Sequence, residues 1–145
     1  MGLKTFKPYT KSTRGTVVLD KSQLWKGAPF KPLTKGQNFT GGRNNNGRIT
    51  SRHMGGGSKH KYRIIDFYRK KKNVKATVER IEYDPNRTSY IALITYEDKE
   101  KTYIICPHGL NVGDKVEAGK NIEIKIGNSL ELRDIKRNDR FIQYG

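Results

Sequence analysis

A dense group of basic side chains occupies the middle of the sequence, and its chemistry is that of anion binding. Ten Lys or Arg fall between residues 43 and 72, and Asp66 is the only acidic residue among them. Such a group attracts a nucleic acid, because each cation that meets a phosphate releases a condensed counterion. Interleaved glycines exclude an amphipathic membrane-surface helix, so no membrane partner is expected. These residues predict a nucleic-acid interface.

The predicted interface combines several kinds of group. Lys and Arg neutralise phosphates, Asn offers hydrogen bonds to base edges, and Arg or aromatic planes stack on unpaired bases. The sequence contains no recognisable helix for the DNA major groove, which favours structured RNA. The predicted contact residues are Lys26, Arg43, Asn44, Asn45, Arg48, Arg52, His53, Lys59, Lys61, Tyr62, Arg63, Arg69, Lys70, Lys71, Lys72, Arg80 and Arg87. Close backbone approach to RNA is predicted at Gly41, Gly42, Gly55, Gly56 and Gly57, because glycine permits it.

The remaining reactive side chains match no catalytic or metal-binding pattern. His53, His60 and His108 do not have the spacing of metal ligands, and Cys106 closes an apolar run as a structural thiol would. The loop over 113–120 departs from the phosphate-binding loop because five residues separate its glycines. We therefore predict no catalytic residue, no metal site and no enzyme activity. The only ions expected are Mg²⁺ or K⁺ bound by the RNA.

Charge and apolar residues are distributed in opposite directions along the chain. Residues 1–75 hold 19 Lys or Arg and two acidic residues, whereas residues 76–145 hold 11 and 12. Ten of the 15 glycines lie in residues 1–60, which are too poor in apolar side chains to offset the entropy of ordering. This division predicts an extended basic RNA-binding arm over 1–60 and a compact domain over 61–128.

The compact domain has the pattern of a small antiparallel barrel. Val74 to Tyr83 change parity after Val78, which predicts a β-bulge near Glu79 and Arg80. Residues 89–96 are apolar at both parities, which predicts a central strand. An open sheet is less favoured, because it leaves long edges unpaired. Strands are predicted at 16–19 in the arm and at 62–67, 74–83, 89–96, 102–106, 115–116 and 122–126 in the barrel.

Several motifs carry a resemblance to a known family. They are Gly41–Thr50, Arg52–His53, Gly55–Gly57, Tyr62–Phe67, Ala76–Arg87, Ile91–Leu93, Tyr103–Ile104, Pro107, Gly113–Asp114 and Gly127–Asn128. Over almost the whole chain, the sequence resembles the universal large-subunit ribosomal protein called L-two. Departures are small: Ser58 stands where the family usually has His, and Cys106 where it usually has Ala.

The resemblance implies a fold, a function and partners. The fold is all-β, a five-stranded OB-fold-like antiparallel barrel preceded by the basic arm. The function is binding of large-subunit rRNA near the peptidyl-transferase region, with support of subunit association and translation. Other large-subunit ribosomal proteins are then partners. A free-standing RNA chaperone or single-strand-binding module is the alternative that the residues leave open.

The resemblance also implies a continuation after the last residue of this sequence. Family members go on into an SH3-like barrel, so residues 129–145 are predicted to be a linker and that barrel's first strand, at Phe141 to Tyr144. A split gene is expected, with a separate chain carrying the C-terminal half. Abundant Lys, Asn, Ile and Tyr, with no Arg- and Ser-rich transit peptide, favour an organelle-encoded protein of the mitochondrial matrix. The bacterial cytoplasm is the alternative.

Overall fold

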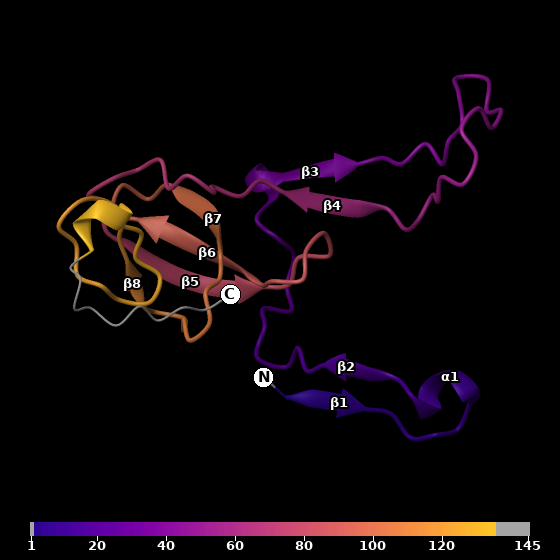
Figure 1. Cartoon of the computed structure of the whole chain (residues 1–145), viewed down its shortest axis with the longest axis horizontal. Coiled ribbons are helices and arrows are strands. Elements are labelled where there is room, and N and C mark those ends of the chain that lie inside the picture. Colours follow the sequence, from indigo (N-terminus) through magenta and orange to yellow (C-terminus); the bar gives the residue numbers. More distant parts are fainter. Residues whose placement is uncertain (1, 136–145) are drawn as a thin grey trace.

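The regular secondary structure of the protein consists almost entirely of short antiparallel strands, joined by long irregular segments. The computed structural model describes residues 2–135, with a curled sheet on one side and two hairpins projecting from it (Figure 1). The elements are β1 (Leu3–Thr5), α1 (Lys11–Arg14), β2 (Val17–Leu19), the 3-10 turn Lys31–Leu33, β3 (Thr34–Gln37), β4 (His60–Arg63), β5 (Ala76–Glu82), β6 (Ile91–Tyr96), β7 (Lys101–Ile105), β8 (Lys115–Val116) and the 3-10 turn Leu132–Asp134. The all-β, OB-fold-like class predicted from the sequence is confirmed.

The curled sheet has four antiparallel strands in the order β7-β6-β5-β8. Strand β6 lies between β7 and β5, which confirms the central strand predicted from its apolar residues at both parities. Ile65 adds a single parallel bridge to Tyr103 at the β7 edge. At the other edge the two-residue β8 pairs with Ala76 and Thr77 of β5, so each edge of the sheet is partly covered by a short pairing.

The core consists of two clusters on opposite faces of β6. One face is formed around Ala92, Ile94 and Tyr96, which pack with residues of β5, β7 and β8. On the other face Leu93 packs with Tyr103, and the arm segment 30–33 covers this cluster through its apolar side chains. Part of the predicted arm therefore packs against the barrel. Strand β6 is apolar on both faces, so each face needs an apolar layer to cover it.

A β-bulge in β5 reverses the direction of its side chains. The register with β6 shifts between Val78 and Arg80, as the change of parity predicts. Val78 and Ile81 consequently pack against the same core cluster although they differ in parity. Arg80 and Glu82 turn toward the opposite side, and Glu82 is buried there. The bulge thus aims two charged side chains at the segment that joins the arm to the barrel.

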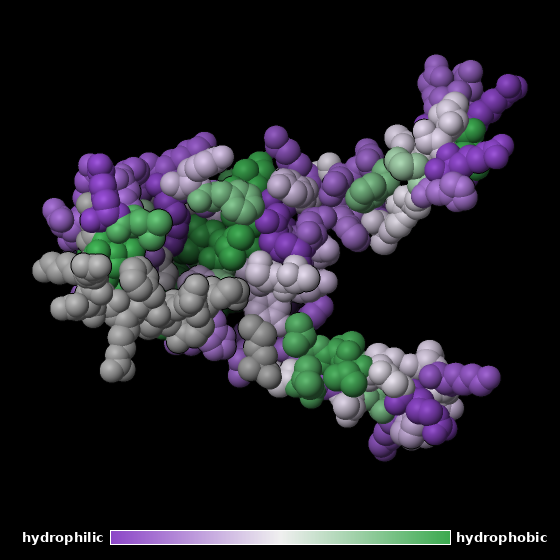
Figure 2. Space-filling model, in the orientation of Figure 1, coloured by the Kyte–Doolittle hydropathy of each residue, from purple (hydrophilic) through white to green (hydrophobic). Residues whose placement is uncertain are grey.

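The arm, together with residues 61–63, forms two hairpins. β1 pairs with β2, confirming the strand predicted at 16–19, and β3 pairs with β4. Gly42 is the only buried residue between 2 and 60, which agrees with the arm's shortage of apolar side chains. Apolar side chains gather on the β1–β2 hairpin and over the barrel, whereas the far end of the β3–β4 hairpin is mostly hydrophilic (Figure 2).

Two strand predictions need correction. The strand predicted at 62–67 ends at Arg63, and the one predicted at 122–126 is absent. In the second case the side chain of Asn128 takes the backbone partners that a ladder would use. Its amide donates to the carbonyl oxygen of Glu123 at 2.8 Å and accepts from the N–H of Glu117 at 2.8 Å. The strand predicted at 141–144 lies outside the described residues.

Candidate nucleic-acid interface

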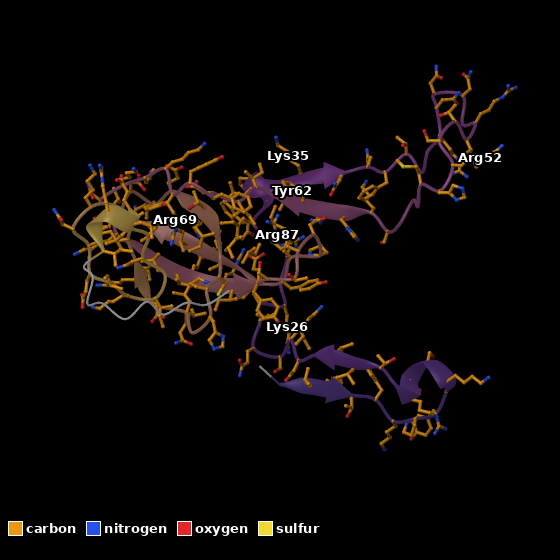
Figure 3. The ribbon with its side chains drawn as sticks, viewed as in Figure 1. Lys26, Lys35, Arg52, Tyr62, Arg69 and Arg87 are labelled. Carbon is orange, nitrogen blue, oxygen red and sulfur yellow. The ribbon has the colours of Figure 1, made fainter. Side chains whose placement is uncertain are left out.

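The β3–β4 hairpin presents basic side chains and no acidic ones. Its register places Lys35 opposite Tyr62 and Gly36 opposite Lys61, all of them exposed. No Asp or Glu occurs between residues 21 and 65. Figure 3 shows Lys35 and Tyr62 on the two strands and Arg52 at the far end of the hairpin. The hairpin therefore carries positive charge along its whole length, and its far end projects away from the barrel (Figure 1).

The end of this hairpin, residues 41–57, is held by its own backbone. The carbonyl oxygen of Gly42 accepts the N–H groups of Thr50 at 2.9 Å and Ser51 at 3.1 Å. The side-chain oxygen of Asn44 accepts the N–H groups of Asn46 and Arg48, both at 3.0 Å. Asn44 thus builds the turn, and only its remaining donors are available to a base edge. We call residues 41–57 the tip.

The tip leaves its cations and part of its backbone open. Gly55 and Gly56 have no atoms within 4 Å of the position that a Cβ would take, so a ligand can approach their backbone closely. The exposed predicted residues of the tip and of the adjoining strand are Arg43, Asn44, Asn45, Arg48, Arg52, His53, Lys59, Lys61 and Tyr62. The structure brings these residues together on one projecting element.

Replacing Gly42 by Ala is expected to distort the tip and weaken binding to an rRNA fragment. The strained backbone alone accounts for a loss of about 5- to 30-fold, and the close contact adds to it. Gly42 has a φ of 72°, and a Cβ would lie 2.1 Å from the carbonyl oxygen of Ser51. Gly47→Ala is the matched control, because Gly47 has a φ of 75° with open space around it. Filter-binding titration of both variants measures the effect, and an equal loss in the two would contradict the role of the close contact.

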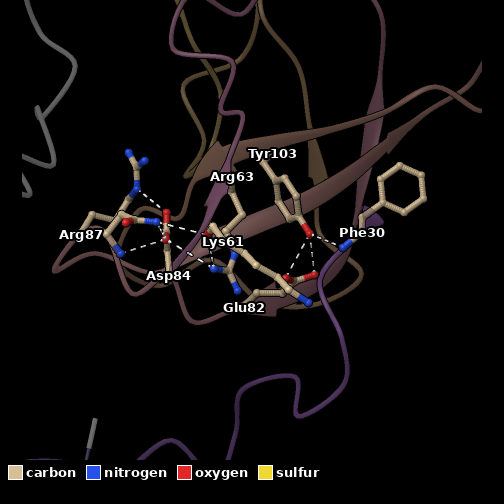
Figure 4. A network of polar contacts seen from close by, with 8 residues as sticks. Phe30, Lys61, Arg63, Glu82, Asp84, Arg87 and Tyr103 are labelled. Atoms are coloured by element: carbon tan, nitrogen blue, oxygen red, sulfur yellow. Dashed lines mark hydrogen bonds and ion pairs between the residues drawn. The ribbon is translucent and has the colours of Figure 1, made fainter. Parts of the chain in front are cut away.

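Two of the predicted arginines lie at the base of the hairpin and bind a buried carboxylate. Asp84 is fully buried, and Arg87 donates to it through Nε at 2.5 Å. Arg63 lies 3.9 Å from the same carboxyl group and donates to the carbonyl oxygen of Lys61 at 2.7 Å (Figure 4). Asn86 adds its backbone N–H at 3.0 Å. This network joins the β5–β6 turn to β4, so it fixes the hairpin against the barrel.

A second network fixes the arm to the barrel through Arg80. Its Nε donates to Glu82 at 2.7 Å, and the carboxylate of Glu82 accepts the hydroxyl of Tyr103 at 3.0 Å. That hydroxyl accepts the N–H of Phe30 at 2.8 Å (Figure 4). Burial disfavours the charged guanidinium, but the hydrogen bond and charge of Glu82 outweigh it and raise the pKa of Arg80. Arg80 also covers the ring of Trp25.

The predicted cations at 69–72 lie on the barrel, apart from the tip. Arg69 is half-buried and donates to the carbonyl oxygen of Gly127, and burial lowers the pKa of Arg69. Lys71 binds Asp98 and Glu100, which raise the pKa of Lys71. Lys72 lies 3.9 Å from Glu131, and Lys70 is exposed. Their positive charge is therefore partly offset by acidic neighbours.

The predicted contact residues thus fall into two groups that the sequence alone does not separate. Those of the tip, Lys59, Lys61, Tyr62 and Lys26 face solvent, whereas Arg63, Arg69, Lys71, Arg80 and Arg87 are bonded to groups of the protein. Lys35 was missed, although its place in an acid-free stretch would have indicated it. Trp25, next to the predicted Lys26, was missed as well.

Among residues 2–135 no helix has the length and apolar character that a membrane crossing requires. Within the same residues, no three His, Cys, Asp or Glu side chains are placed to share a metal ion.

A curled antiparallel sheet with a projecting, acid-free basic hairpin is the architecture of an OB-like nucleic-acid-binding module. Comparison with known families gives the particular family. The model described as Ribosomal Proteins L2, RNA binding N-terminal domain matches residues 30–118. The chain belongs to this family, which confirms the resemblance seen in its motifs.

Individual relatives agree with the family model. The chain is 60% identical over 136 residues to the large ribosomal subunit protein uL2 of Pelagibacter ubique, covering 93% of this chain and 48% of that protein. It is 60% identical over 135 residues to the same protein of Rickettsia canadensis, covering 93% and 50%. For Paracoccus denitrificans the values are 59% over 130 residues, 90% and 47%. The chain therefore spans about half the length of the curated relatives it matches.

Proposed function

We propose that this chain is a structural constituent of the large ribosomal subunit and binds large-subunit rRNA, with no catalytic activity of its own. The observation that carries the proposal is the β3–β4 hairpin, which projects from the barrel without a single acidic residue between 21 and 65. Its exposed cations can neutralise phosphates, and its open glycine backbone permits close approach. Membership of the L2 family supplies the identity of the RNA.

The two groups of basic residues have different roles in this proposal. Exposed side chains of the tip contact phosphates, whereas Arg63, Arg80 and Arg87 first hold the hairpin and the arm in place. The arm over 1–60, the barrel over 61–128 and the linker from 129 are then functional units, although residues 30–33 pack on the barrel. In this arrangement the barrel is the anchor and the hairpin the RNA-contacting element.

Finer statements extend the same proposal. The relatives' name places them in the large ribosomal subunit. We propose that this chain lies near the peptidyl-transferase region, supports subunit association and translation, and contacts other large-subunit proteins. We also propose a mitochondrial ribosome, with bacterial relatives fitting a bacterial cytoplasm as the alternative. We further propose that a separate chain carries the region that corresponds to the unmatched C-terminal half of these relatives.

Sedimentation of ribosomes through a sucrose gradient at high salt tests the proposal. We expect the chain to remain with the large subunit, because an integral constituent also makes close backbone contacts with the RNA at its open glycines, and salt weakens these less than it weakens phosphate contacts. Release into light fractions would support a free-standing RNA chaperone or single-strand-binding module instead. Mass spectrometry of intact proteins in the same large-subunit fraction shows whether the C-terminal half of the family is a separate polypeptide or continuous with this one.

A further inference from the structure

The single tryptophan of the chain lies half-exposed beside an open cavity of the barrel. Trp25 is in the segment that joins the β1–β2 hairpin to the barrel, and 49% of its surface is exposed. The cavity has a volume of about 670 Å³. Leu24, Ile81 and Val112 supply apolar lining, and Trp25, Lys26 and Arg80 complete this side of it. The ring therefore borders a space that a ligand can enter, next to the exposed cation Lys26.

The position of Trp25 is fixed before any ligand arrives. Its backbone N–H donates to the carbonyl oxygen of Ile81 at 2.9 Å. The guanidinium carbon of Arg80 lies 4.7 Å from the ring centroid, and Glu82 holds Arg80 in turn. On another side, a Cβ on Gly27 would lie 2.6–2.8 Å from atoms of the indole ring, so the backbone approaches the ring as closely as a glycine allows. Such a ring is a preorganised platform.

We propose that this cavity binds an unpaired base of an RNA, stacked on the indole ring of Trp25. The inference rests on the proposed function and deepens it, because it names an unpaired nucleotide as one part of the RNA that the chain recognises. Stacking on an aromatic ring accepts any base, since every base has a π-face. The nucleotide's phosphate meets Lys26, which is exposed and lies between the two hairpins (Figure 3).

Charge at the cavity is compatible with a nucleotide. Glu79 is the one carboxylate in the lining, and Lys101 binds it at 2.6 Å while Thr95 donates to it at 2.9 Å. The hydrogen bond from Lys101 lowers the pKa of Glu79, and the charge of Lys101 offsets that of the carboxylate. Arg80 is offset by Glu82 in the same way, so the exposed Lys26 leaves the rim positive. A nucleotide gains from this charge through its phosphate as well as its ring, whereas an aromatic side chain of a partner protein gains only through its ring, so the observations favour RNA.

The fluorescence of Trp25 provides a direct test, because no other tryptophan contributes to the signal. The full-length chain is titrated with a short oligoriboadenylate, with an RNA duplex of equal length and with heparin, while fluorescence anisotropy of labelled RNA reports total binding. We expect quenching by the oligoriboadenylate and little by the duplex or heparin. Trp25→Ala is expected to weaken binding of the single strand by about 5- to 150-fold, and Trp25→Phe by less.

A pair of glycine variants separates the ring's position from its presence. Gly27→Ala keeps the tryptophan but pushes its ring away, so it is expected to reduce both the quenching and the affinity for the single strand. Gly15→Ala is the matched control, because an added Cβ there meets nothing within 4 Å. Binding of RNA without quenching, and without an effect of Trp25→Ala, would overturn the stacking site alone. Absence of any RNA binding would overturn the proposed function as well.

Discussion

Replacing Asp84 by Ala is expected to lower the free energy of unfolding by about 3–5 kcal/mol, the cost of removing one partner from a buried ion pair. Asp84 is fully buried and bonded to Arg87 at 2.5 Å, and Arg63 lies 3.9 Å away. Without the carboxylate, two largely buried guanidiniums lose their counter-charge and repel each other. Urea denaturation followed by far-UV circular dichroism measures the loss.

Two further variants make this expectation specific. Asp84→Asn keeps the acceptor for the N–H of Asn86 but removes the charge, so it is expected to lose less stability than Asp84→Ala. Glu123→Ala removes an ion pair of equal charge at the surface, where the Glu123 side chain is 71% exposed. It is expected to change stability by less than about 0.5 kcal/mol. Similar losses in Asp84→Ala and Glu123→Ala would show that burial of the pair does not matter.

The features of the barrel that follow from side-chain parity could be predicted from the sequence. Parity locates the bulge between Val78 and Arg80, because the core-facing set changes there. It also locates the central strand over residues 91–96, because only a strand buried on both faces is apolar at both parities. Both features depend only on residues that are close together in the chain, so the sequence alone is enough to predict them.

Features that depend on distant partners could not be predicted. Asp84 binds Arg63 across 21 positions and Tyr103 binds Phe30 across 73, and no periodicity connects such pairs. For this reason the sequence alone could not separate the basic residues that face solvent from those that are bonded within the protein. The failed strand at 122–126 has a similar origin, because alternation alone does not show that the side chain of Asn128 takes the backbone partners.

Replacing Arg43, Arg48 and Arg52 together by Gln is expected to weaken binding of an rRNA fragment by about 100- to 500-fold near 0.1 M salt. All three are exposed on the tip. Each phosphate contact contributes roughly 0.7–0.9 to the slope of log affinity against log salt concentration, so losing three contacts reduces the slope by about 2–3. Filter binding over a series of salt concentrations measures both quantities.

A matched variant distinguishes local contacts from net charge. Lys99, Lys115 and Lys120 are exposed on the barrel, and replacing them by Gln removes the same three charges as the tip variant. If long-range attraction by the overall charge of +16 drove binding, the two variants would lose affinity equally. If the projecting hairpin holds the RNA, the barrel variant keeps nearly the full affinity and salt slope. Because Arg43, Arg48 and Arg52 lie on the tip, in a stretch of sequence without acidic residues, they reach phosphates without competition from carboxylates, and the second result is the one expected.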